Sequence, residues 1–220
     1  MLFLSYILNH NTPTYGNRNQ FNITKKSSIL EGDVANDSSI ETTVHIGTHI
    51  DMPYHFYEDG QTIEDFSDDF WIFKNILIIE IKPKNVIVKK ELIEKLNDLK
   101  SNEIELIIVK TDICNIRKED DFWKNNYGFH PDIYDYLVEN FPKVRVLGFD
   151  SISVSSFSER MLGRESHKRF LNPSRPILLL EDMDLREISK NTSFDRIIIA
   201  PLRIAKCDGL PCTIMGFSND

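Results

Sequence analysis

The sequence predicts an α/β fold, built as a single domain around a mixed β-sheet. Short apolar runs rich in β-branched residues recur along the chain, and they are too short for helices, which is typical of buried strands. Helical patterns lie between several of these runs, and such alternation indicates an α/β sheet. The chain has 220 residues and no Pro/Gly/Ser-rich linker, so we expect one domain over residues 1–220.

The first expected strand is the apolar N-terminal segment 1–8, which we interpret as buried. No Lys or Arg precedes it and no small-residue cleavage site follows, so it lacks the pattern of a signal peptide. The polar segment 16–39 is expected to form strands or loops over a surface. The later apolar runs predict buried strands at 76–81, 106–109, 144–149, 177–180 and 197–200.

Two helices are expected between these strands. Residues 90–100 place Leu and Ile side chains on one stripe, and residues 131–140 begin with Pro131, a residue favoured in the first turn. Several strands end in polar residues, at 110–112, 150–151 and 181–182. Polar groups at strand ends of an α/β sheet commonly face a ligand crevice, although a strand end also simply meets solvent.

The charge balance excludes two classes of partner. The chain carries 26 Lys+Arg against 34 Asp+Glu, a formal net charge of −8, and its pI is near 5.3. Nucleic-acid binding needs a basic footprint, and so does adhesion to an anionic membrane, so we expect neither. No apolar run approaches the length of a membrane helix. The expected partner is a small-molecule substrate.

The cysteines indicate a cytoplasmic protein. Cys114, Cys207 and Cys212 are odd in number and form no C-x-x-C pair. Reduced thiols are therefore favoured over disulfides, and a zinc site formed by the last two is disfavoured.

Residues 43–56 carry the pattern that points to chemistry: Thr-Val-His-Ile-Gly-Thr-His-Ile-Asp-Met-Pro-Tyr-His-Phe. Gly47, Pro53 and the β-branched residues oppose a helix, so we expect an extended segment. Side chains of an extended segment alternate between two faces, and here one face is apolar. The other face gathers three imidazoles and one carboxylate, those of His45, His49, Asp51 and His55.

This face predicts a metal site. Imidazoles and a carboxylate packed together repel or compete unless a cation organises them, and the N/O set suits Zn²⁺, Mn²⁺ or Fe²⁺ better than Ca²⁺ or Mg²⁺. A straight strand would separate the α-carbons of His45 and His49 by about 13 Å. A shared ion therefore requires a bend between them, and Gly47 permits one.

Further ligands are expected from distant segments. Glu181 closes the apolar run 177–180, and a carboxylate at the end of a buried strand is costly unless it is paired or metal-bound. His167 lies 14 residues before it. Both are candidate ligands by residue type, with packing roles as the alternative. His130 precedes a predicted helix, where capping explains it, and His10 has no assigned role.

The pattern His45-x-Gly-Thr-His49-x-Asp51-x-Pro53-x-His55-Phe56 resembles the signature of the cyclase-like metal-dependent hydrolases, the family of bacterial kynurenine formamidase and isatin hydrolase. Seven fixed residues within the eleven positions from His45 to His55 make this motif specific. Weaker similarities lie at 4–6 with 12–16, at 148–151, and at 201–202 with 208–211, so the resemblance extends along most of the chain.

The resemblance implies a swivelling β/β/α domain that is usually oligomeric, so we expect a homodimer or homotetramer. It implies a divalent metal, Zn or Mn, as one or two ions. His45, His49 and Asp51 would bind one ion, and Asp51 would bridge to a second ion held also by His167, with Glu181 shared between the two ions.

The implied reaction is hydrolysis of an amide, formamide or cyclic amide C–N bond, as in an arylformamidase. A metal ion lowers the pKa of a bound water and polarises the scissile carbonyl. His55 would be the catalytic residue that takes the proton and returns it to the leaving nitrogen. Tyr15 stands where the family's formamidases carry Trp, and it is the expected substrate-binding residue.

Two other functions stay open on the residues alone. In a non-heme Fe(II) oxygenase, His49, Asp51 and His167 would form a 2-His-1-carboxylate set and Arg175 would hold a 2-oxo acid. A non-catalytic, metal-stabilised binding module would instead saturate the ion with protein ligands and leave no open position.

Overall fold

The fold is built on one large mixed β-sheet, seen in the computed structural model, which describes residues 1–218. The last two residues of the predicted domain 1–220 lie outside the described residues. The strands of this sheet are β1 (Leu2–Phe3), β4 (His49–Asp51), β5 (Ile72–Phe73), β6 (Ile76–Glu80), β8 (Leu106–Lys110), β10 (Val146–Phe149), β11 (Leu178–Glu181), β12 (Arg196–Pro201) and β13 (Gly209–Phe217). Their order is β5-β12-β13-β4-β11-β10-β8-β6, and β1 pairs with β13.

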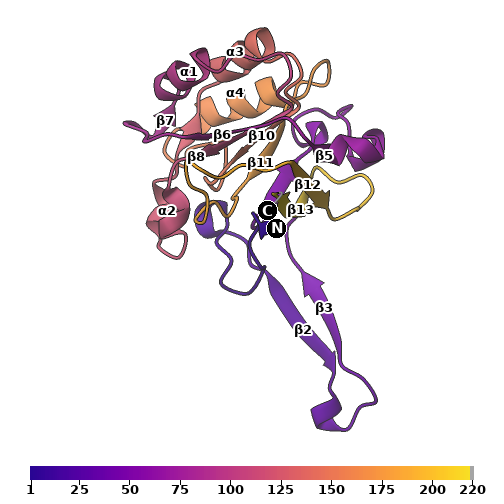
Figure 1. The fold of residues 1–220 in the computed structure, drawn as a ribbon. Coiled ribbons are helices and arrows are strands. Elements are labelled where there is room, and N and C mark those ends of the chain that lie inside the picture. The colour runs from indigo at the N-terminus through magenta and orange to yellow at the C-terminus, as the bar shows by residue number, and fades with distance from the viewer. Residues whose placement is uncertain (219–220) are drawn as a thin grey trace.

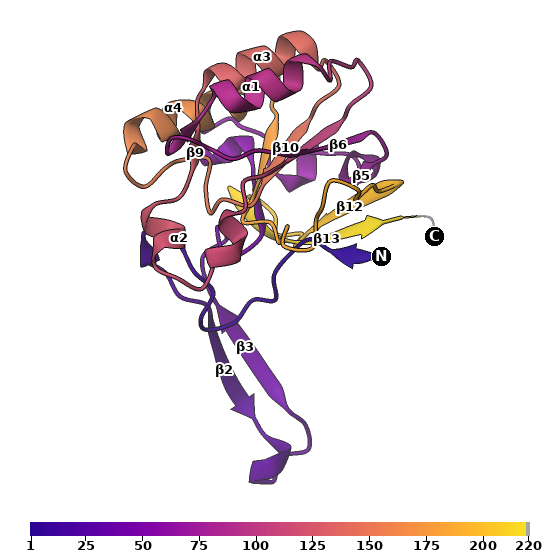
Figure 2. The same cartoon turned by 60° about the vertical axis from the view of Figure 1, so that its left-hand side comes forward.

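One half of the sheet is parallel. Strands β6, β8, β10 and β11 run in the same direction, and helices α1 (Lys90–Asn97), α3 (Asp132–Asn140) and α4 (Arg160–Phe170) lie on the connections between them. The three helices cover one face of this half (Figures 1 and 2). All side chains of β8, β10 and β11 are buried, which is why these strands are continuous apolar runs in the sequence.

The other half is antiparallel and contains the histidine-rich strand. Strand β4 pairs antiparallel with β11 on one side and with β13 on the other. In this register Glu181 lies opposite His49, and Gly209 lies opposite Asp51. The pairing therefore brings residues that are far apart in the chain to one point of the sheet.

The remaining elements are short. They are the 3₁₀ turns η1 (Tyr15–Asn17), η2 (Ile29–Glu31), η3 (Pro53–His55), η4 (Ile63–Asp65), η5 (Asp68–Trp71) and η6 (Ile113–Ile116), the helix α2 (Asp121–Lys124), and the parallel pair β7 (Ile87–Val88) and β9 (Gly128–Phe129). Strands β2 (Asn22–Ser27) and β3 (Asp37–Glu41) form an antiparallel hairpin that projects away from the body (Figure 1). We call this hairpin the arm. Among residues 1–218, no helix has both the length and the apolar composition needed to cross a bilayer.

The predicted fold class is confirmed, and the predicted strands after residue 70 appear with ends shifted by one or two residues. The prediction for segment 1–8 is wrong in extent: only Leu2–Phe3 forms a strand, at the side of β13, and Phe3 and Ile7 are exposed. Helix α4 was not predicted. Its buried residues are Gly163, Ser166, His167 and Phe170, of which only Phe170 is a large apolar side chain, so the helix has no continuous apolar stripe.

Candidate active site

The histidine-rich segment bends as predicted at Gly47, which has φ +56°. This left-handed conformation favours glycine, and a Cβ at this position would also displace the side-chain end of Leu8, whose Cδ2 would lie 2.3 Å away. The bend leaves the rings of His45 and His49 with centroids 5.3 Å apart. The predicted extended segment ends earlier than expected, because Pro53 begins the 3₁₀ turn η3 directly after β4.

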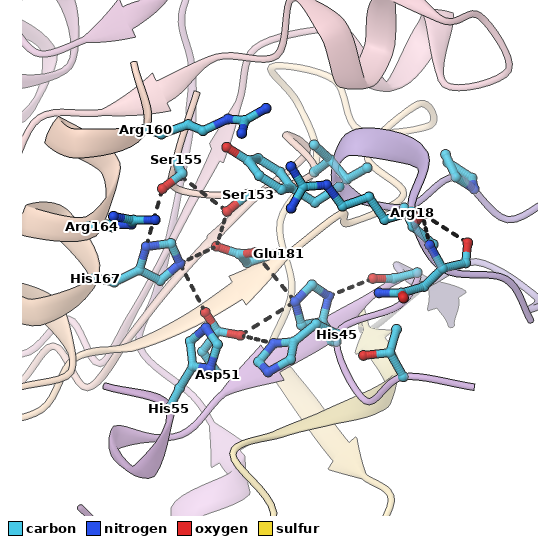
Figure 3. Close-up of a pocket in the computed structure, with 18 of the residues that line it drawn as sticks. Arg18, His45, Asp51, His55, Ser153, Ser155, Arg160, Arg164, His167 and Glu181 are labelled. Atoms are coloured by element: carbon cyan, nitrogen blue, oxygen red, sulfur yellow. Dashed lines mark hydrogen bonds and ion pairs between the residues drawn. The ribbon is translucent and has the colours of Figure 1, made fainter. Parts of the chain in front are cut away.

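The predicted site residues converge on one cavity of about 360 Å³, shown in Figure 3. They come from the segment before β4, from β4 itself, from η3, from α4 and from the end of β11. The cavity lining includes His45, His49, Asp51, His55, His167 and Glu181, and also Tyr15. Their convergence is a structural finding, and their individual roles stay predictions.

Two histidines present the same ring nitrogen to the centre of the site. His49 Nδ1 lies 2.8 Å from Gly47 O, and His167 Nδ1 lies 2.8 Å from Gly163 O. A carbonyl oxygen only accepts, so Nδ1 carries the hydrogen in both rings and Nε2 is left as the potential ligand atom. The two Nε2 atoms each lie 3.4 Å from a different oxygen of Asp51.

The carboxylates at the centre are deeply buried. Asp51 and Glu181 are only 1% and 2% exposed. Val154 N donates to one Glu181 oxygen at 2.7 Å, whereas Asp51 Oδ2 is buried with no hydrogen-bond partner. A buried carboxylate oxygen without a partner is costly, and a bound cation would remove that cost.

The protonation tendencies agree with this demand for positive charge. Although burial opposes ionisation, the contacts with His45 and His167 hold the pKa of Asp51 well below its usual range. In turn, burial would lower the pKa of His49 and of His167, but their contacts with the carboxylates of Asp51 and Glu181 raise both. Protons on the imidazoles therefore supply the positive charge that a divalent ion would otherwise bring.

The donor atoms fit a divalent cation in two overlapping groups. His45, Asp51 and His55 offer ligand atoms within 4.8 Å of one another, and so do His49, Asp51 and Glu181. Nitrogen and carboxylate oxygen donors in such a set suit Zn²⁺ or Mn²⁺. Asp51 belongs to both groups.

Asp208 is the site residue that the sequence reasoning missed. Its Oδ2 accepts hydrogen bonds from His45 Nε2 at 2.8 Å and from His55 Nδ1 at 3.0 Å. These bonds hold the pKa of Asp208 well below its usual range. Against the effect of burial, Asp51 and Asp208 raise the pKa of His45 to about 9. The sequence signal for Asp208 was the segment 208–211, which resembles the family's C-terminal loop. Nothing in that segment alone indicates that the aspartate contacts the histidines.

The strand order explains how Asp208 reaches the site. It directly precedes β13, and its carbonyl oxygen accepts a hydrogen bond from Met52 N at 3.0 Å, next to β4. The following Gly209 packs against the imidazole of His45: a Cβ there would lie 2.5 Å from the ring atom Cε1. Glycine at 209 is thus required by the close approach of the ring.

Other polar strand ends serve the protein itself. Asp150 accepts hydrogen bonds from the backbone N and the hydroxyl of Thr111, and Asp182 pairs with Arg117 through two bonds of 2.8 and 2.6 Å. Of the three predicted polar ends, only that of β11 reaches the cavity, through Glu181.

Arg175 lies outside the site. Its guanidinium donates to Pro142 O at 2.8 Å, and the residue does not line the cavity, so the proposed anchor for a 2-oxo acid is wrong. His130 Nδ1 accepts from Asp132 N at 3.2 Å, which confirms its predicted capping role. The three cysteines are free.

With this fold and site, the chain belongs to the cyclase family: the family model described as "Putative cyclase" matches residues 3–156. The kynurenine formamidase of Bacillus cereus (strain ATCC 14579) is 26% identical over 208 residues, which cover 94% of this chain and 92% of the relative. The structure of isatin hydrolase A from Labrenzia aggregata, bound to benzyl benzoate, matches with a TM-score of 0.80 and 16% identity, covering 97% and 91% of the two chains. A solved potential metal-dependent hydrolase with cyclase activity matches with a TM-score of 0.73 and 22% identity, covering 97% and 94%. The family resemblance in the sequence is confirmed.

Proposed function

We propose that the protein is a divalent-metal-dependent hydrolase that cleaves an amide, formamide or cyclic amide C–N bond, with an activity like that of an arylformamidase. The kynurenine formamidase and isatin hydrolase relatives support this class of reaction. The observation that carries the proposal is the position of His55. It lies beside the predicted ligands and is oriented by Asp208, so it is a base held next to a cation site.

When bound, the divalent ion acidifies a water molecule and polarises the scissile carbonyl. The residues that would hold it are His45, His49, Asp51, His167 and Glu181. For His45 one of its two carboxylate contacts must give way, since Asp51 and Asp208 occupy both ring nitrogens.

The proton transfer is assigned to His55. An ionised Asp208 can only accept, so the hydrogen lies on His55 Nδ1 and Nε2 is free to take a proton. The carboxylate stabilises the imidazolium that results, and His55 then returns the proton to the leaving nitrogen. The adjacent cavity of about 360 Å³ leaves room for a substrate, which favours catalysis over a closed binding module.

We propose Zn or Mn as the metal, bound as one or two ions. The two oxygens of Asp51 support a two-ion site, because Oδ1 faces His45 and His49 whereas Oδ2 faces His167. Elemental analysis of the protein as purified, followed by titration of chelated protein with each metal, measures the identity and the number of ions.

The test of the function is a substrate panel of aryl formamides, isatin and cyclic imides, assayed with the metal-loaded protein. His55→Ala is expected to lower kcat by about 10²- to 10⁴-fold, the usual contribution of a positioned acid or base. The matched control is His10→Ala, which removes an exposed imidazole outside the cavity. Full turnover by His55→Ala on a substrate that the wild type cleaves would overturn the assignment.

We also propose a homodimer or homotetramer, with the arm as the contact between copies. A lone two-stranded hairpin is marginally stable in water, and this one exposes apolar side chains at its tip, among them Leu30 and Val34. Substitution of Leu30 and Val34 by Ser is expected to lower the mass measured by sedimentation equilibrium, whereas Leu99→Ser, at an exposed position just after α1, is not. An unchanged mass in the arm variant would contradict this contact.

We propose that the protein acts in the cytoplasm on a small molecule, with no nucleic-acid or membrane partner. The free thiols of its cysteines and its net charge of −8 support this proposal.

A further inference from the structure

Three arginines line the cavity that contains the predicted metal ligands. They are Arg18, Arg160 and Arg164, labelled in Figure 3. Within residues 1–218, none of the three has a carboxylate oxygen within 4.0 Å, although the chain has 34 acidic residues. Of the seven other arginines in residues 1–218, four have such a partner, namely Arg117, Arg145, Arg169 and Arg186, and Arg175, Arg196 and Arg203 do not. The cavity thus concentrates unneutralised positive charge in an acidic protein.

Helix α4 places two of these arginines in line with a predicted ligand. Arg160, Arg164 and His167 have the spacing i, i+4 and i+7, so they share one face of the helix. At 1.5 Å per residue, Arg164 lies about 4.5 Å and Arg160 about 10 Å from His167 along the helix axis. The positive charges therefore extend from the buried His167 toward solvent, because Arg160 and Arg164 are both exposed.

This placement is unfavourable for the helix itself. Arg160 is the first residue of α4, where the helix dipole disfavours a positive charge, and the first turn contains no acidic residue. Arg160 and Arg164 are also a like-charge pair one turn apart, which is destabilising by a few tenths of a kcal/mol. Helix stability therefore does not explain the two charges.

The guanidinium of Arg160 is held in position by an aromatic ring. It stacks over Phe157 at 4.0 Å from the ring centroid, and its Nε donates to Phe157 O at 3.2 Å. It also interacts with Tyr15, which lines the same cavity. With Nε engaged, the terminal nitrogens are left as the donors for a ligand.

Arg18 reaches the same place from the other side of the cavity (Figure 3). Its turn is closed by Thr14, whose hydroxyl bonds with both the N and the O of Asn19 at 3.3 and 3.1 Å. A Cβ at Gly16 would lie 3.0 Å from the Phe157 ring and 3.3 Å from Arg18 Nε, so the arginine crosses the open space above this glycine. Arg18 and Arg160 thus flank one aromatic ring.

We infer that the substrate is an anion whose carboxylate binds to Arg18 and Arg160, with Arg164 nearer the reacting bond; this inference rests on the proposed function. A guanidinium matches a carboxylate with two parallel hydrogen bonds. The cavity is thus polarised, with the buried predicted ligands at its centre and the exposed arginines at its solvent side. An amide that also carries a carboxylate binds in one orientation only, with the reacting bond beside His55.

The primary test is binding to the zinc-loaded protein, measured by calorimetry with two probes of the same shape, anthranilate and the neutral anthranilamide. Wild type is expected to bind the carboxylate at least about ten-fold more tightly. Arg160→Gln and Arg18→Gln should each remove about ten-fold of that affinity and leave the amide unaffected. The matched control is Arg169→Gln, which lies on α4 but pairs with Asp135 outside the cavity.

Two outcomes overturn the inference. In one, wild type binds both probes equally. In the other, the carboxylate preference persists in the arginine variants, which would mean that the carboxylate binds the metal.

Steady-state kinetics on a charged and an uncharged formamide distinguish a failure of this inference from a failure of the proposed function. N-formylanthranilate and its methyl ester present the same formamide with and without the charge. A higher KM for the acid alone in Arg160→Gln supports the inference, and equal kinetics on acid and ester in all variants overturns it while leaving the hydrolase intact. If neither compound is cleaved but anthranilate binding still depends on the arginines, the proposed function fails for these formamides and the anion site stands.

Discussion

The substitution Asp208→Ala tests the pairing that orients the predicted base. It removes the single oxygen that accepts from both His45 and His55, at 2.8 and 3.0 Å. His55 then loses the partner that holds its hydrogen on Nδ1, so its ring samples orientations and tautomers that present no base to the substrate.

The geometry sets the expected size of the effect. A hydrogen bond to a charged group contributes about 1.5–3 kcal/mol. The Asp208 side chain is 40% exposed, so water competes with the imidazoles and the lower end applies. A loss of about 1.5 kcal/mol in the transition state corresponds to about a ten-fold lower kcat, with KM little changed. The kcat of Asp208→Asn, which keeps an acceptor oxygen but no charge, should lie between those of the wild type and Asp208→Ala.

The assay is a double-mutant cycle with His55→Ala on one cleavable formamide, with metal content measured for every variant. If Asp208 acts through His55, its removal has almost no further effect once His55 is absent. A further ten-fold loss in the double variant would refute this reasoning. If Asp208→Ala loses bound metal, Asp208 instead acts by orienting His45, a predicted metal ligand.

Two further predictions concern His45. Gly209→Ala puts a Cβ 2.5 Å from the His45 ring, so the imidazole must move. Metal affinity, measured by chelator competition, should then fall by about ten-fold or more. Unchanged affinity would show that His45 is not a ligand in this orientation. In the chelated protein, the pKa of His45 is raised from 6.5 to about 9. The protonated ring therefore stabilises the fold fully below pH 6.5, and this stabilisation is lost as pH rises through about 9. The shift sets an upper bound of about 3 kcal/mol on this contribution to the free energy of unfolding. Thermal unfolding from pH 6 to pH 10 should show this decline, and His45→Asn should flatten it; a wild-type profile without decline would contradict the pairing with Asp51 and Asp208.

The parts of the fold that were predictable have local signatures. Strands such as β8 and β11 are covered on both faces, so they appear as unbroken apolar runs. Helices α1 and α3 bury one apolar stripe each, and that stripe is visible at helical spacing. Helix α4 was missed for the opposite reason: it buries a site residue, His167, together with Gly163, Ser166 and only one large apolar side chain, that of Phe170.

The spacing between the distal candidates illustrates the same limit. The 14 residues from His167 to Glu181 comprise the end of α4, a turn and strand β11. A helix followed by a strand returns the chain to the sheet, so two residues that are distant along the chain lie beside the same Asp51. Residue type suggested both as ligands, but only this path explains how they meet.

The sequence by itself determined the chemistry of the central segment. Three histidines, one aspartate and a glycine lie within eleven positions, and their alternation and the bend at Gly47 are short-range properties of the backbone. Only the tertiary structure decided which ring nitrogens face the centre and which residue orients the base. His55 and Asp208 are 153 residues apart, and their contact exists because β13 pairs with β4. Pairing of that kind depends on the closure of the whole sheet, so no local pattern encodes it.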